Sequence, residues 1–283
     1  MPIRLIALDI DGTLLDSTSQ LSEANKQAIA ESAARGVEIV LVTGRRFDFA
    51  RPIAAQLPCE LHLIVSNGAL IKSNAGETHQ QLLLPAEIAR HVIEETREFR
   101  ALCSVVFDRP REGQMIFEAI NWEDPVRGRY FQRNRENIAT VAPLTACLDG
   151  DDPIQVMFVG RFEQIRAAKR LIDSLPRADE YTVSLTEYES RDFSILDVLR
   201  RGVNKGAALA EWTRHRNIAP AEVMAIGDNW NDREMLEFAG VPIVMGNAIA
   251  ELKTRGWETT LSNDQSGVAA AIRKYAGENG QPK

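Results

Sequence analysis

The chain has 283 residues, of which 45% are hydrophobic and 26% are charged, and its formal net charge is -7. These proportions are ordinary for globular domains and exclude collagen-like, disulfide-scaffold and disordered chains. The negative balance gives no general electrostatic reason to bind nucleic acid or an anionic membrane, so neither is expected as a partner.

The cysteine pattern and the hydropathy bear on location. Cys59, Cys103 and Cys147 show neither a C-x-x-C spacing nor a metal-finger pattern, which favours buried free thiols in a reducing compartment. No stretch reaches the roughly 20 apolar residues of a membrane span, and the first apolar run is short and broken by acids. We therefore expect a cytoplasmic protein.

The first 70 residues alternate short apolar runs with amphipathic stretches, which is typical of βαβ units and a parallel sheet. Strands are expected at 5–8, 37–44 and 61–69, and helices over 22–35 and 46–57. Ser22 provides an N-cap for the first helix, and Gly36 follows its end. All three strands are followed by polar residues and glycine, at the edge where open parallel sheets bind ligands.

From about residue 85 the pattern becomes that of a separate α+β domain. Helices are expected at 85–99 and 162–175, strands at 103–107, 113–119, 153–160, 181–187 and 192–199, and a hairpin connection at 108–113.

After about residue 200 the parallel-sheet pattern returns. Helices are expected at 204–215 and 231–240, strands at 222–228 and 241–246, and a frayed tail at 277–283. The sequence thus predicts an α/β fold with a discontinuous core domain, 1–84 and 200–283, and an inserted domain, 85–199.

Two acids end the first strand in "LDIDGT". Because side chains alternate on a strand, Asp9 and Asp11 lie on the same side and bring two carboxylates close together. Such a pair needs a bound cation, or one member must stay protonated, and either solution is chemically useful. Gly12 lets a backbone N–H approach a ligand closely, although Asp-Gly is also a common turn dipeptide.

Three later segments carry polar residues that could complete a site with Asp9 and Asp11. In "LVTGR", Thr43 stands beside Gly44 and Arg45, and in "VNKGAAL", Lys205 stands at a helix start, where an anion would offset its unfavourable interaction with the helix dipole. "GDNWND" supplies Asp228, Asn231 and Asp232, which are hard oxygen ligands of the kind that Mg²⁺ prefers.

Together these segments resemble the haloacid dehalogenase superfamily, whose D-x-D-G-T signature is matched at 9–13. The resemblance implies a Rossmann-like core with an inserted cap, and it assigns Asp9 as the nucleophile that forms an aspartyl phosphate and Asp11 as general acid and base. It assigns phosphate binding to Gly12, Thr43, Gly44, Lys205 and Asn231. It places Mg²⁺ on Asp9, the Asp11 backbone carbonyl and Asp228, with Asp232 as support.

The insertion after "SNGA" at 66–69, together with "GDNWND" and "MGNA" at 245–248, resembles the Cof-type branch, whose members are mostly Mg²⁺-dependent phosphatases of small metabolites. The resemblance implies a sugar phosphate or cofactor phosphate as substrate, a cap that selects it, and substrate contacts at Arg45 and Asn67. In the cap, Arg127, Arg129, Arg133 and Arg135 form a basic cluster, interpreted as a solvated face rather than an anion site.

Two alternatives to a hydrolase stay open. A phosphomutase or phosphotransferase on the same core would pass the phosphoryl group to a second substrate. A signalling receiver also phosphorylates an aspartate, but it has neither a second acid two residues later nor an inserted cap. The sequence leaves the physiological substrate and the oligomeric state undetermined.

Overall fold

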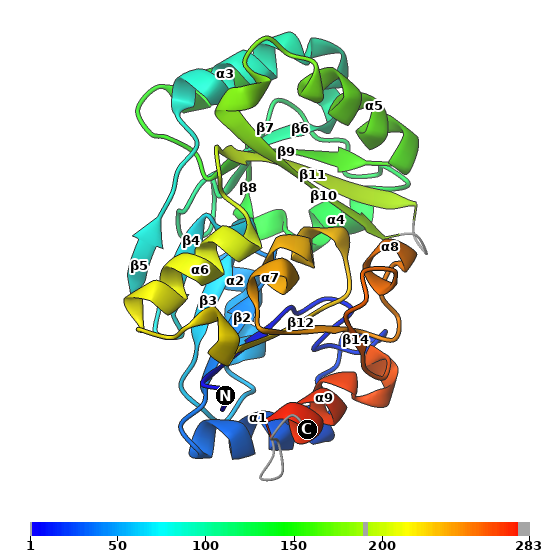
Figure 1. Cartoon of the computed structure of the whole chain (residues 1–283). Helices are drawn as coiled ribbons and strands as arrows, with labels where there is room; N and C mark the ends of the chain where they lie inside the picture. The colour runs from blue at the N-terminus through cyan, green and yellow to red at the C-terminus, as the bar shows by residue number, and fades with distance from the viewer. Residues whose placement is uncertain (1, 189–191, 277–283) are drawn as a thin grey trace. The chain divides into compact units, whose positions relative to one another are not determined.

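The computed structural model describes residues 2–188 and 192–276 and divides into two compact units, residues 2–81 with 204–276 and residues 82–203 (Figure 1). The first unit is discontinuous in sequence, because the chain leaves it after residue 81 and returns at residue 204. These boundaries lie three or four residues from those expected at 84/85 and 199/200. The tail predicted to fray, 277–283, lies outside the described residues.

The described residues of the first unit form an eight-stranded sheet in the order β14-β13-β12-β1-β2-β3-β4-β5. The six strands from β14 to β3 run parallel to their neighbours, whereas β4 and β5 are added antiparallel. The bounds are β1 Leu5–Leu8, β2 Glu38–Val42, β3 His62–Val65, β4 Leu70–Ser73, β5 Thr78–Gln81, β12 Val223–Gly227, β13 Val241–Val244 and β14 Glu258–Thr259.

The five parallel strands expected from the sequence are confirmed, and β4, β5 and β14 are additional. These three were missed because they are short, and β5 reads "THQQ", without the apolar alternation that marks a half-buried strand. The expected strand over 61–69 is shorter than predicted, since Ser66 and Asn67 adopt positive φ angles of 50° and 54° and end it.

Helices of the first unit connect these strands. They are α1 Glu23–Ala34, α2 Phe47–Ala54, α6 Lys205–His215, α7 Arg233–Phe238, α8 Ala250–Lys253 and α9 Gly267–Tyr275. Helix α1 packs beside α9, and α6 beside α7 (Figure 1). Ser22 caps α1 as expected, by accepting a hydrogen bond from the Asn25 N–H at 3.2 Å. Among the helices that the structure describes, none has the length and apolarity needed to cross a membrane.

The second unit is built on a six-stranded sheet in the order β10-β11-β9-β6-β7-β8, within the described residues. Adjacent strands of this sheet pair antiparallel, except β7 and β8, which are parallel. The bounds are β6 Cys103–Val106, β7 Met115–Phe117, β8 Ile138–Thr140, β9 Gln155–Gly160, β10 Tyr181–Tyr188 and β11 Phe193–Arg200. The expected hairpin at 108–113 is confirmed, because β6 and β7 pair across it and the Phe107 N–H bonds the Gln114 carbonyl at 2.9 Å.

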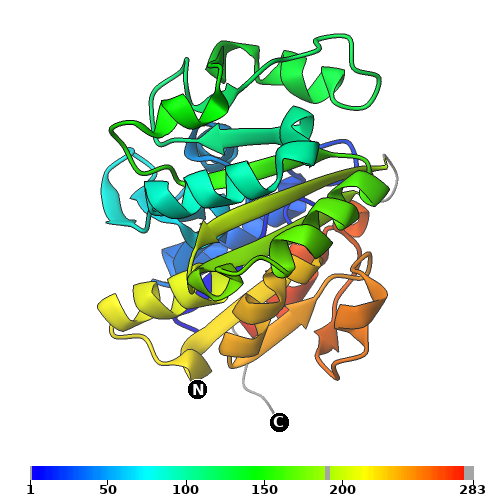
Figure 2. The ribbon, with the colours of Figure 1, turned by 90° about the horizontal axis from the view of Figure 1, so that it is seen from above.

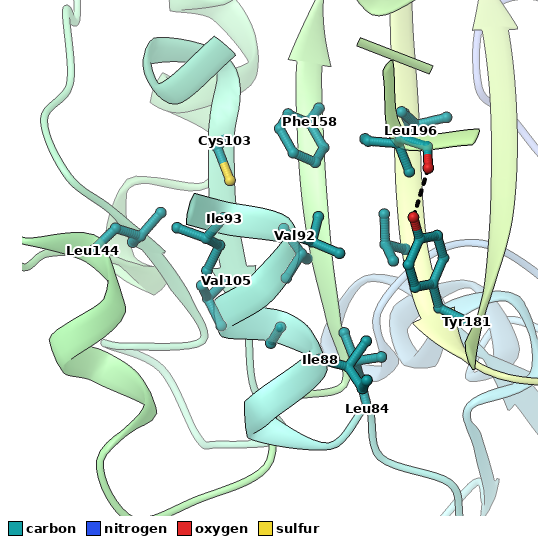
Figure 3. Close-up of a cluster of buried hydrophobic side chains, with 14 of the residues drawn as sticks. Leu84, Ile88, Val92, Ile93, Cys103, Val105, Leu144, Phe158, Tyr181 and Leu196 are labelled. Atoms are coloured by element: carbon teal, nitrogen blue, oxygen red, sulfur yellow. Dashed lines mark hydrogen bonds between the residues drawn. The ribbon is translucent and has the colours of Figure 1, made fainter. Parts of the chain in front are cut away.

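Helices α3 (Ala86–Glu95) and α5 (Phe162–Asp173) cover one face of this sheet, while the short α4 (Gly128–Arg133) follows β7 (Figure 2). Alternate residues of the strands, such as Val156 and Phe158, point into an apolar cluster beneath the helices (Figure 3). The Tyr181 hydroxyl in this cluster donates to the Ile172 carbonyl at 2.6 Å.

The cysteines are free thiols, as expected, but their burial differs from the prediction. Cys103 is buried in the apolar cluster, where loss of water raises the pKa of its thiol, whereas Cys59 and Cys147 are half-buried. The prediction of three buried thiols was therefore wrong for two of them, because a cysteine pattern carries no information about burial.

Candidate active site

Polar residues follow three neighbouring strands of the core sheet at the same edge. Asp9 follows β1, Thr43 follows β2, and Asp228 follows β12. These strands are adjacent and parallel, so their carboxyl ends coincide. All three side chains are buried, which is unusual for polar residues unless they are paired.

A buried ion-pair network joins the first strand end to two later segments. The Lys205 ammonium donates to Asp9 Oδ1 and to Asp232 Oδ1, both at 2.6 Å. The lysine side chain is 1% exposed, that of Asp9 7% and that of Asp232 0%. Asn204 places the lysine, because its side chain caps α6 by accepting from the Ala207 N–H at 2.7 Å, which starts the helix at Lys205.

The electrostatics of this network are dominated by an excess of carboxylates. Burial, together with the charge of Asp232, raises the pKa of Asp9 to about 7 despite the opposing effect of Lys205. Burial and the charges of Asp9 and Asp232 also raise the pKa of Asp228 well above its usual value. Burial by itself would lower the pKa of Lys205, but the carboxylates of Asp232 and Asp9 outweigh it and raise that pKa. One lysine thus faces more negative charge than it neutralises.

Asp228 is held by the loop after the first strand. The Thr13 hydroxyl donates to Asp228 Oδ1 at 2.8 Å. Gly12 has a φ of 83°, and a Cβ there would lie 2.3 Å from Asp228 Oδ2, so this position requires glycine. The Asn247 amide donates to the Gly12 carbonyl at 2.8 Å and holds the same turn.

Sequence reasoning gave no role to Thr13 or Asn247. Both lie in quoted motifs, Thr13 in "DIDGT" and Asn247 in "MGNA", so the motifs contained the signal. Their partners lie 215 and 235 positions away in sequence, which local pattern cannot supply.

Asp232 accepts hydrogen bonds from three groups of this chain, so it holds these segments together and has no carboxylate oxygen without a donor. Its Oδ1 accepts from Lys205, and its Oδ2 accepts from the backbone N–H groups of Asp228 and Asn229, each at 3.0 Å. Both oxygens are therefore occupied by donors of this chain.

Two asparagines meet near the end of the second strand. The Asn231 amide donates to Asn67 Oδ1 at 3.1 Å, and the Asn67 N–H donates to the Thr43 carbonyl at 3.1 Å. A Cβ at Gly44 would lie 3.0 Å from Asn67 Oδ1, so the loop packs tightly here. Four residues expected to bind phosphate or substrate thus lie together.

Arg45 contacts an acid of the same site. Its Nε donates to Asp11 Oδ2 and its Nη2 to Asp11 Oδ1, both at 2.6 Å. The Asp11 side chain is 34% exposed, in contrast to that of Asp9. The two acids of the opening motif therefore have different environments and different cationic partners.

The residues present fit a divalent cation. Carboxylate oxygens of Asp9, Asp228 and Asp232 lie within 4.8 Å of one another, and burial combined with the excess negative charge favours a cation there. Hard carboxylate oxygens suit Mg²⁺. Because both Asp232 oxygens are engaged, Asp9 and Asp228 are the better ligands.

Three of the four arginines in the cluster of the inserted unit are solvated, as interpreted from the sequence, whereas the Arg127 side chain is only 12% exposed. Arg129, Arg133 and Arg135 are exposed, while Phe131 is buried as the apolar anchor. Arg127 forms an ion pair with Asp124 at 2.7 Å.

Comparisons with known proteins identify a family and several relatives. A family model described as haloacid dehalogenase-like hydrolase matches residues 6–272. The chain is 32% identical to an HMP-PP phosphatase of Serratia proteamaculans, over 89% of this chain and 86% of that protein. It is 30% identical to the chloroplastic endoribonuclease YBEY of Arabidopsis thaliana over 96% of its own length, but it spans only 46% of that protein. A haloacid dehalogenase-like hydrolase from B. subtilis has a structure that aligns with a TM-score of 0.79 at 26% identity, over 96% of this chain and 99% of that one.

Proposed function

Because the chain belongs to the haloacid dehalogenase-like hydrolase family, we propose that it is a Mg²⁺-dependent phosphatase that hydrolyses a small phosphorylated metabolite through an aspartyl-phosphate intermediate. The observation that carries the proposal is the buried network in which Lys205 joins Asp9 to Asp232 at the end of β1. Relatives that are named phosphatases, and that align with this chain over most of their length, support the same activity.

In the first step, a carboxylate oxygen of Asp9 forms a bond to phosphorus while the bond from phosphorus to the leaving-group oxygen breaks. That oxygen keeps the electron pair and takes a proton from Asp11. Attack brings an anionic carboxylate toward an anionic phosphate, and the Lys205 ammonium offsets part of this repulsion. Burial of Asp9 and Lys205 strengthens that interaction, because little water screens it.

In the second step, water releases the phosphate. Asp11, now ionised, takes a proton from the water whose oxygen attacks phosphorus, and the Asp9–phosphorus bond breaks to restore the carboxylate. Thr43, Asn231 and the backbone N–H groups at Gly12 and Gly44 are the proposed donors to the phosphoryl oxygens.

Asp9, Asp228 and the Asp11 carbonyl would hold Mg²⁺, and Asp232 would support them. When bound, the ion supplies charge neutralisation at the phosphoryl group. Thr13 orients the Asp228 carboxylate for this task through its hydrogen bond.

The substrate is a small phosphorylated molecule, with a sugar phosphate or a cofactor phosphate as the proposed class. We propose that the inserted unit, residues 82–203, selects the leaving group. An HMP-PP phosphatase among the relatives supports testing cofactor-type phosphates beside sugars.

The test is inorganic phosphate release from a panel of sugar phosphates, nucleotides, FMN and pyridoxal phosphate, with Mg²⁺ or with EDTA. We expect Mg²⁺-dependent release that Asp9→Asn lowers by more than about 10³-fold, because the nucleophile is lost. Substrate consumption without phosphate release would instead indicate a phosphotransferase or mutase. No turnover of any substrate by folded, Mg²⁺-binding protein would refute the proposal.

A further inference from the structure

We propose that Arg45 is a positioning residue, which holds the Asp11 carboxylate in place for proton transfer to the leaving group. The inference rests on the proposed function, since it assigns a role within that reaction. It also replaces the direct substrate contact expected for Arg45 from the sequence.

The contact has the geometry of a guanidinium fork on a carboxylate. Two different nitrogens of Arg45, Nε and Nη2, each donate to a different oxygen of Asp11 at 2.6 Å. A two-point contact fixes the rotation of the carboxylate as well as its position, which a lysine cannot do.

Arg45 is itself anchored at both ends. Its N–H donates to Thr43 Oγ1 at 3.1 Å, and its carbonyl accepts from the Ser66 N–H at 2.9 Å. At the far end of the side chain, Nη1 donates to the Phe49 carbonyl in α2 at 3.4 Å. The Arg45 backbone is thus tied to the residues that follow β2 and β3, and its guanidinium is tied to α2.

Asp11 needs such support more than Asp9 does. The Asp9 side chain is 7% exposed and bonded to a buried lysine, whereas that of Asp11 is 34% exposed. Asp11 also precedes Gly12, whose φ of 83° marks a tight turn rather than a continued strand. A half-exposed carboxylate without a fixed partner would sample several rotamers, and few of them would face a leaving group.

The fork also implies a movement during the reaction. Both Asp11 oxygens accept hydrogen bonds from Arg45 in this structure. One of these contacts must therefore open before that oxygen can be protonated and donate its proton to the leaving-group oxygen of the substrate. The remaining contact would keep the carboxylate in place while the other oxygen acts.

The experiment compares two substrates that differ in their need for a proton. The leaving group of p-nitrophenyl phosphate is a stabilised phenolate, whereas a sugar phosphate expels a poor alkoxide that requires protonation. The variants are Arg45→Ala, Arg45→Lys and a matched control, Arg51→Ala, an exposed arginine of α2. The measured quantity is kcat/KM, which reports the steps up to departure of the first product.

We expect Arg45→Ala to lower kcat/KM for the sugar phosphate by about 10–100-fold, part of the about 10²–10⁴-fold that general acid catalysis supplies. The loss for p-nitrophenyl phosphate should stay below about 3-fold, Arg45→Lys should fall between wild type and Arg45→Ala, and Arg51→Ala should match wild type. In an Asp11→Asn background, Arg45→Ala should have little further effect, because both changes remove the same contribution.

Two results would overturn the inference. An equal loss for both substrates, carried by KM, would indicate direct contact of Arg45 with the phosphate. An unchanged kcat/KM for the sugar phosphate would show that the fork has no role. If Arg45→Ala does not fold, Arg45→Lys decides between the same outcomes, because it keeps the charge but not the fork. Failure of the proposed function is separate, because wild-type protein would then hydrolyse neither substrate.

Discussion

The Lys205 network at the sheet edge and the apolar interior of the inserted unit around Phe158 are both buried but are stabilised by different interactions. In the first, Lys205, Asp9 and Asp232 are buried and joined by charged hydrogen bonds of 2.6 Å. In the second, apolar side chains from α3, α5 and the sheet pack together, and the Tyr181 hydroxyl is satisfied by a backbone carbonyl.

The difference concerns what each interior tolerates. Apolar packing is non-directional, so a core accepts related hydrophobic side chains of similar volume. A buried ion network depends on each partner, because removing one leaves a charge without compensation. We therefore expect conservative substitutions to separate the two regions clearly.

The largest effect on stability is expected for Lys205→Met, which keeps an unbranched side chain as far as Cε and removes the charged Nζ. The free energy of unfolding should fall by about 3–5 kcal/mol, because the carboxylates of Asp9 and Asp232 lose their buried partner. Denaturant unfolding measures this change. The matched control is Lys274→Met, which breaks an exposed pair with Glu258 and should change stability by less than about 1 kcal/mol. Equal losses of stability in the two variants would contradict the expectation that the buried pair matters more than the exposed one.

The second-largest effect on stability is expected from removal of Mg²⁺, and it should arise only from the charged region. At a Mg²⁺ concentration 100 times its Kd, binding should stabilise the fold by about 2.7 kcal/mol relative to EDTA. Scanning calorimetry would detect this as a rise in Tm of about 5–10 °C. Asp228→Asn should abolish the rise. A Tm that is the same in Mg²⁺ and EDTA would argue against a site at Asp9 and Asp228.

A conservative change in the apolar cluster should matter less. Phe158→Leu keeps a large hydrophobic side chain at a fully buried position of β9, so we expect a loss of about 1–1.5 kcal/mol in the free energy of unfolding. Urea unfolding of this variant beside Lys205→Met compares the regions directly. A larger loss for Phe158→Leu than for Lys205→Met would reverse the proposed order.

The smallest effect is expected at a charged contact of the inserted unit. Burial opposes ionisation of Asp124, but hydrogen bonds from Arg127 and from backbone N–H groups outweigh it and lower its pKa from 3.8 to about 2. Because the folded-state pKa is depressed, the stabilisation is present above about pH 4 and is lost as the pH falls toward 2. Asp124→Asn should remove about 1 kcal/mol at pH 7. The gap from wild type should shrink with acidification, and a gap that widens instead would show the sign to be wrong.

The parts of the fold that the sequence predicted were those with strong local patterns. The parallel strands β1, β2 and β12 are apolar runs that end in polar residues, and such runs identify buried strands. Strands β4 and β5 were missed because their residues show no clear period, and because β4 is added to β3 and β5 to β4 by tertiary pairing.

The candidate site was predicted as a set of residues but not as a set of contacts. The motifs identified Asp9, Asp11, Lys205 and Asp228, and the parallel strands explain why Asp9 and Asp228 meet. Local patterns could not show that Arg45 would contact Asp11, because the contact depends on how the turn after β2 faces the end of β1.

Local hydrophobic period and short motifs were enough to predict the family of this protein, its α/β fold with an insertion, and the residue types at the strand ends. The partners of those residues depend on tertiary packing, which no local pattern contains. Lys205 reaches Asp9 across 196 positions of sequence, because the fold brings the start of α6 to the end of β1. Thr13 reaches Asp228 across 215 positions, because β1 and β12 are neighbours in the sheet. Burial followed from the same packing, and together with the charge of Asp232 it raises the pKa of Asp9 to about 7, a property that no motif contains.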